Sequence, residues 1–134
     1  MYSIIIREDG NKHPIISGIR ASIDSNNLCG VYDIRKITDL FKIVFLPSEK
    51  LIITDPVVYL LTIILKPNAK KIFFSLEMFE FQRLNKGISI IKNLVFRLTH
   101  FLALKNSSMV IFPNKARYRF YLFKGWLNKE KCKI

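Results

Sequence analysis

Cysteine is scarce in this chain of 134 residues: there are two, Cys29 and Cys132, near opposite ends of the sequence. Neither belongs to a CxxC pair or has a histidine pair nearby, so the sequence predicts no zinc or other metal site. We interpret both cysteines as free thiols in a reducing compartment. The length is sufficient for one compact domain over residues 1–134 that buries its own core without disulfides.

Long apolar runs are missing as well. The longest run, residues 57–65, is far shorter than the roughly 20 residues that are needed to cross a bilayer. The amino terminus, MYSIIIRED, becomes acidic where a secretory signal would need a longer apolar stretch. We therefore expect a cytoplasmic protein that makes at most peripheral contact with the inner face of the cell membrane.

Glycine-rich phosphate loops are also absent: the sequence contains neither GxGxxG nor GxxxxGKS/T, so no cofactor is predicted. The two histidines, His13 and His100, are far apart in the chain. His100 falls on the polar side of a predicted helix, and we expect a surface or capping role for it more than a catalytic one.

Acidic residues are few in the second half of the chain. Residues 1–67 contain 8 Lys+Arg and 7 Asp+Glu, whereas residues 68–134 contain 14 and 3. Such a basic half indicates an anionic partner, either membrane phospholipid or nucleic acid. The alternative is compositional drift, because the chain is rich in Ile, Lys, Asn and Phe throughout.

Short apolar strands alternate with amphipathic helices. Strands are predicted at residues 2–7, 51–54, 72–75 and 108–112, and helices at 33–47, 55–65, 91–102 and 114–125, whereas residues 1–32 are otherwise left unassigned. Asp55 before Pro56 and Asn114 are predicted N-caps, and Gly125 a helix end. This order predicts an α/β fold, a Rossmann-like three-layer sandwich with a mainly parallel sheet.

Helical spacing also predicts which side chains of three helices face the core. The inward residues are expected to be Ile37, Leu40, Phe41, Val44 and Phe45 in the first helix, Val57, Leu61, Ile64 and Leu65 in the second, and Ile91, Leu94, Val95, Leu98, Phe101 and Leu102 in the third.

Two carboxylates, Glu77 and Glu80, directly follow the strand at residues 72–75. Ligands of parallel α/β folds bind beyond the carboxyl ends of strands, so both are candidate binding residues. The alternative is that they cap the next helix or pair with Arg83 or Lys86. Asp55 also follows a strand, but capping explains it fully.

Basic and aromatic residues interleave between positions 115 and 124. Lys115, Arg117, Arg119 and Lys124 are candidate contacts to an anionic membrane or another anion. Stacking on single-stranded nucleic acid is a second interpretation. The third is ordinary burial of the rings against the sheet.

The stretch LIITDPVVYLLTIILKPNAKKIFFSLEMFEF resembles GT-B glycosyltransferase N-terminal domains, where a strand ends in an Asp-Pro turn and the next strand leads to an acidic motif, here Ser75-Leu76-Glu77. The part from VFRLTHF to the end is similar to their long helix, following strand and Arg-containing helix. The resemblance covers roughly residues 33–134. It implies one half of a GT-B fold.

The resemblance also implies a function. The chain would bind the acceptor of a glycosyltransferase, a glycan or lipid-linked molecule, with Glu77 and Glu80 near its hydroxyls and the basic half facing a membrane. The nucleotide-sugar would be held by a C-terminal donor-binding domain or a second chain, without which we expect no activity. The alternatives are a gene remnant without function and a non-enzymatic basic α/β module that binds anionic membrane or, less favoured, nucleic acid.

Overall fold

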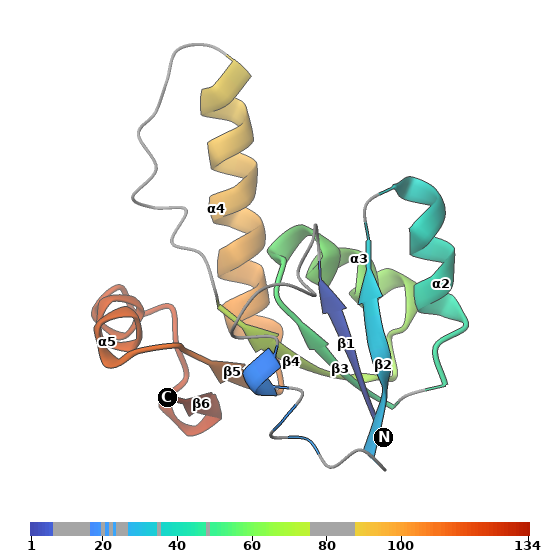
Figure 1. Ribbon diagram of the computed structural model, residues 1–134. Coiled ribbons are helices and arrows are strands. Elements are labelled where there is room, and N and C mark those ends of the chain that lie inside the picture. The colour runs from blue at the N-terminus through green and yellow to red at the C-terminus, as the bar shows by residue number, and fades with distance from the viewer. Residues whose placement is uncertain are drawn as a thin grey trace.

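The computed structural model describes residues 1–6, 17–19, 21, 23, 27–34, 36–47, 49–75 and 88–134. Six strands alternate with helices along the chain (Figure 1). The elements are β1 (Tyr2–Ile6), β2 (Leu28–Asp33), η3 (Ile37–Asp39), α2 (Leu40–Val44), β3 (Lys50–Ile53), α3 (Pro56–Leu65), β4 (Lys70–Phe74), α4 (Ile88–Asn106), β5 (Met109–Ile111), α5 (Lys115–Phe123), η5 (Lys129–Lys131) and β6 (Cys132–Lys133).

All six strands form one sheet in the order β2-β1-β3-β4-β5-β6, and every neighbouring pair is parallel. The predicted α/β, Rossmann-like fold with a parallel sheet is therefore confirmed. In the sheet, β2 lies on one side of β1, whereas β3, β4, β5 and β6 follow one another on the other side. The connection from β1 to β2 therefore crosses the sheet in the opposite direction to every later connection. Because such crossovers are right-handed, the first connection lies on one face of the sheet and the later helices lie on the other.

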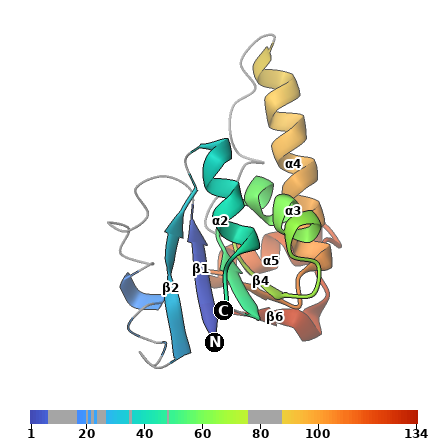
Figure 2. The same ribbon diagram turned by 90° about the vertical axis from the view of Figure 1, so that its right-hand side faces the viewer.

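Among the described residues, the two faces of the sheet bury very different amounts of side chain. One face carries the main core, in which Ile5, Leu51 and Phe73 of the strands pack with residues of α2, α3, α4 and α5. The opposite face has a small cluster of Ile4, Ile6 and Ile52, against which helical residues near Ile19 pack. Figure 2 shows α2, α3 and α4 on one side of the sheet and the short N-terminal helical segment on the other.

The predicted starts of α3 and α5 are confirmed by their caps, whereas α4 extends beyond the predicted residues 91–102 at both ends and the helix predicted at 33–47 is reduced to η3 and α2. Asp55 accepts hydrogen bonds from the backbone N–H groups of Val57 and Val58 at 2.8 and 2.9 Å, and Pro56 is the first residue of α3. Asn114 accepts one from the N–H of Arg117 at 2.9 Å. Gly125, which follows α5, has a φ of +67°, a left-handed conformation that glycine adopts without strain.

The predicted inward faces of the helices are largely wrong. Phe41, Val44 and Phe45 are exposed, whereas Ile43 of the same helix is buried. In α3 the buried residues are Pro56, Val58, Tyr59 and Thr62, and Ile64 is 77% exposed. In α4, Ile91, Leu94, Val95 and Leu98 are all exposed. Apolar residues occur around most of these helices, so spacing alone does not select the face that meets the sheet.

Two strands were not predicted. β2 lies in the region that was left unassigned, and its sequence, LCGVYD, includes Gly30 and ends in an aspartate, which are weak strand signals. β6 has two residues, Cys132 and Lys133, and forms the edge of the sheet beside β5. Both depend on pairing with a neighbouring strand, which local pattern does not reveal.

Candidate functional site

The carboxyl ends of the parallel strands meet along one edge of the sheet. Asp33 ends β2, Asp55 follows β3, Ser75 follows β4 and Asn114 follows β5. The chain reverses its direction of travel across the sheet between β1 and β3, which makes this position the topological switch point. In open α/β sheets, ligands bind beyond the carboxyl ends of strands at such a point.

A buried polar cluster lies at this edge and joins β4 to α4 and α5. The Ser75 Oγ is 3.0 Å from the His100 Nε2, and the Tyr121 hydroxyl is 3.3 Å from the His100 Nδ1. All three residues are at most 1% exposed. The His100 ring also meets the rings of Phe73 and Tyr121 edge-on, with centroids 5.5 and 5.1 Å away.

His100 is therefore not a surface residue, and that prediction is wrong. Its neighbours Asn93 and Thr99 are buried too, so α4 meets the sheet through a face that contains polar side chains. A serine within hydrogen-bond reach of a histidine resembles a nucleophile with its base. The Ser75 side chain is fully buried, however, so the arrangement as it stands positions α4 and α5 and does not present a nucleophile to a substrate.

Arg117 reaches the same edge from α5. Its Nη1 donates a hydrogen bond to the backbone carbonyl oxygen of Ser75 at 3.1 Å, while its own backbone N–H is held by Asn114. The side chain is half-buried. Arg117 thus brings positive charge beside Ser75, the residue that follows β4, at the carboxyl edge of the sheet.

The other three predicted basic contacts are exposed. Lys115 and Arg119 lie on α5, and Lys124 follows its last turn. The Lys124 Nζ lies 4.9 Å from the ring centroid of Phe120 and 4.8 Å from that of Trp126, which is cation–π geometry.

The rings interleaved with these basic residues mostly face inward. Tyr121 is fully buried, and Tyr118 and Phe120 are partly buried against the core, whereas Phe123 is 93% exposed. Ordinary burial therefore accounts for most of this aromatic pattern. Few rings are left for stacking with bases.

The remaining predicted site residues, Glu77 and Glu80, lie outside the described residues, as does His13. Asp55 serves as the N-cap of α3, as predicted. Among the residues that the structure describes, no three His, Cys, Asp or Glu side chains gather as metal ligands would. Within the same set, no helix is long and apolar enough to cross a membrane.

One basic residue is buried far from this edge. Burial lowers the pKa of Lys71, whose side chain belongs to the second residue of β4. Its Nζ donates to the backbone carbonyls of Lys66, Pro67 and Ala69 at 2.8, 3.1 and 2.9 Å. These acceptors use its three donors and tie the end of α3 to β4, so Lys71 has a structural role.

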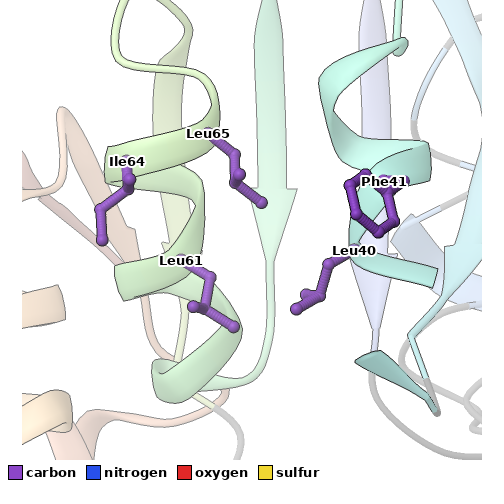
Figure 3. A pocket seen from close by; sticks show the side chains of 5 residues that line it. All are labelled: Leu40, Phe41, Leu61, Ile64 and Leu65. Atoms are coloured by element: carbon purple, nitrogen blue, oxygen red, sulfur yellow. The ribbon is translucent and has the colours of Figure 1, made fainter. Parts of the chain in front are cut away.

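Two hollows elsewhere on the molecule are lined mainly by apolar side chains, unlike the polar carboxyl edge of the sheet. The first lies between α2 and α3, has a volume of about 170 Å³ and is lined only by aliphatic and aromatic side chains, with Leu40 and Leu61 facing each other (Figure 3). The second, of about 690 Å³, lies on the face of the sheet opposite the main core, where Ile72, Phe74 and Ile111 contribute to its lining. The few polar groups needed to orient a small ligand are missing from the first.

These features define a class of protein: a Rossmann-like α/β domain whose polar residues gather at the carboxyl edge of a parallel sheet. No protein-family model matches the chain, and no curated protein matches it.

Proposed function

We propose that this chain is the acceptor-binding half of a glycosyltransferase, which transfers a sugar from a nucleotide-sugar to a glycan or lipid-linked acceptor. The observation that carries the proposal is the carboxyl edge of the all-parallel sheet, where Ser75, Asn114 and Arg117 follow β4 and β5, beside the switch point between β1 and β3. It supplies the place where ligands of such folds bind. The resemblance of residues 33–134 to GT-B N-terminal domains supplies the substrate class.

The described residues at the edge suit a polar, uncharged or anionic ligand. Arg117 offers a guanidinium beside the carboxyl end of β4, Asn114 offers its amide nitrogen after β5, and the backbone of the first turn of α5 adds N–H groups. Glu77 and Glu80 follow β4 directly in the sequence. Hydrogen-bonding groups of this kind hold sugar hydroxyls, for which shape and polar contacts provide specificity.

The contribution of such a half to catalysis is proximity. No covalent nucleophile is required of the chain, because the acceptor hydroxyl oxygen itself bonds to the anomeric carbon of the donor while the bond from that carbon to the phosphate oxygen breaks. The nucleotide leaves with the electron pair of that bond, and the hydroxyl proton passes to a base or to solvent. Holding the two reactants in line accelerates a bimolecular step strongly. The donor would be bound by a C-terminal domain or a second chain, and the acceptor-binding half would be inactive alone.

Amide chemical shifts test this assignment. The ¹⁵N-labelled protein would be titrated with chitotriose, maltotriose and mannotriose and, separately, with a nucleotide-sugar. We expect the oligosaccharides to shift the amides of Ser75, Asn114 and Arg117, and the nucleotide-sugar to leave them in place. The proposal would be contradicted if only the nucleotide-sugar shifted these amides, or if no oligosaccharide shifted any amide at this edge.

A matched pair of variants sharpens the test. Arg117→Ala removes the guanidinium beside Ser75, whereas Arg119→Ala removes an exposed guanidinium two residues along the same helix. We expect only the first variant to weaken the oligosaccharide response, by about tenfold, as for one lost hydrogen bond to a charged group. Equal responses of the two variants would remove Arg117 from the site.

A further inference from the structure

Helix α4 has an apolar stripe that the described part of the domain leaves exposed. Five aliphatic side chains are 49–67% exposed: Ile90, Ile91, Leu94, Val95 and Leu98. With 3.6 residues per turn these positions form one continuous strip along the helix. The buried residues of α4, which include Asn93, His100 and Leu104, lie on the opposite side. We call the five exposed side chains the α4 stripe.

The α4 stripe lies beyond the carboxyl edge of the sheet. His100 meets Ser75, the residue that follows β4, so the helix from Ile88 to His100 extends past the end of that strand by about 18 Å at 1.5 Å per residue. Figures 1 and 2 both show the first turns of α4 projecting from the body of the molecule on this side. The α4 stripe is thus on the same side of the molecule as the proposed acceptor edge.

Basic groups accompany the α4 stripe. On the helical wheel Lys92 lies beyond one border of it and Arg97 beyond the other, and Lys105 follows along the same face. Residues 88–134 contain ten Lys and Arg and a single acidic residue, Glu130. An aliphatic strip with basic borders is the pattern of helices that lie in the interface of anionic bilayers.

From this arrangement we propose that the α4 stripe inserts into the interfacial region of an anionic phospholipid bilayer, with the exposed Lys92 and Lys105 at the level of the headgroups. A second copy of the chain fits less well, because pairing two stripes would bring their basic borders together. Nucleic acid fits less well because the α4 stripe has no aromatic ring on which a base could stack. Anionic lipid satisfies both the aliphatic and the basic component.

This inference deepens the proposed function, because a lipid-linked acceptor would lie in the bilayer that α4 contacts, beside the carboxyl edge. Plain phospholipid vesicles test it without any sugar. Failure of the vesicle test would leave acceptor binding at the edge standing, and failure of the oligosaccharide titration would leave membrane binding standing.

The experiment is co-sedimentation of the full chain with vesicles of phosphatidylglycerol and phosphatidylcholine, and with vesicles of phosphatidylcholine alone. The double variant Leu94→Gln with Leu98→Gln removes the centre of the α4 stripe. Its matched control, Val44→Gln with Phe45→Gln, changes two exposed apolar residues at the end of α2. All four positions are exposed, and circular dichroism would verify that both variants fold.

We expect the stripe variant to lower the partition coefficient on anionic vesicles by about 100-fold, the loss for two inserted leucines, and the α2 control to change it less than about threefold. Lys92→Glu should lower it by about fivefold or more on anionic vesicles alone. Equal losses in the stripe and control variants would overturn the proposal. Equal binding of the wild type to neutral and anionic vesicles would overturn it too. A third contradicting result would be a stripe variant that no longer forms a dimer present without lipid but still binds vesicles as the wild type does.

Discussion

Replacing Asp55 by alanine should destabilise the domain without touching its core. The Asp55 carboxylate accepts two backbone hydrogen bonds at the start of α3, at 2.8 and 2.9 Å. Loss of such an N-cap costs about 0.5–2 kcal/mol, and loss of the negative charge at the helix N-terminus adds about 0.3–1 kcal/mol. We expect a decrease in the free energy of unfolding of about 1–2.5 kcal/mol.

For a chain of this size the decrease corresponds to a fall in melting temperature of about 4–10 °C, measured by circular dichroism or calorimetry. Asp55→Asn is the matched control, because asparagine caps as well as aspartate and removes only the charge. It should lower the unfolding free energy by about 0.3–1 kcal/mol. An alanine variant as stable as the wild type, or an asparagine variant that loses as much as alanine, would refute the capping role.

Two further predictions concern buried tyrosines. Tyr121→Phe should lower the free energy of unfolding by about 1–3 kcal/mol, because the His100 Nδ1 loses its buried hydroxyl partner. Chemical denaturation measures this loss. Tyr118→Phe, at a half-buried position, is the control, and an equal or larger loss in that variant would contradict the prediction. Burial raises the pKa of Tyr59 above its ordinary value of 10.0. The neutral Tyr59 side chain therefore contributes to the free energy of unfolding fully below pH 10, and this contribution is lost as pH rises through the pKa of the folded state. Between about pH 9 and 11.5 the unfolding free energy of the wild type should therefore fall more steeply than that of Tyr59→Phe, and parallel curves would contradict the assignment.

Local signals predicted the ends of α3 and α5 because such signals act over a few residues. Asp55 with Pro56, Asn114 and Gly125 are each recognisable without tertiary contacts, since a cap satisfies backbone groups of its own helix. The strand at residues 2–7 and the three later strands are short apolar runs between such signals. Their alternation with helices was enough for the fold class.

The candidate site was predicted in part. Asn114 was predicted as a helix cap and Arg117 as a contact to an anionic partner, but the hydrogen bond from Arg117 to Ser75 was not predicted. The cluster of Ser75, His100 and Tyr121 was missed altogether. These three residues are 21 to 46 positions apart in the chain, and nothing in the local pattern indicates that a polar side chain of α4 turns toward the sheet.

By itself the sequence determined the alternation of β1, β3, β4 and β5 with helices, the caps of α3 and α5, and the α/β class, because each depends on residues within a few positions of one another. Only the tertiary structure decided which face of each helix is buried. The physical reason is that two faces of α4 compete for the sheet, one aliphatic and one that mixes polar and apolar side chains. Because His100 hydrogen-bonds to Ser75 and Tyr121, the mixed face packs against the sheet. The aliphatic face is thereby left outside, where we propose that lipid covers it.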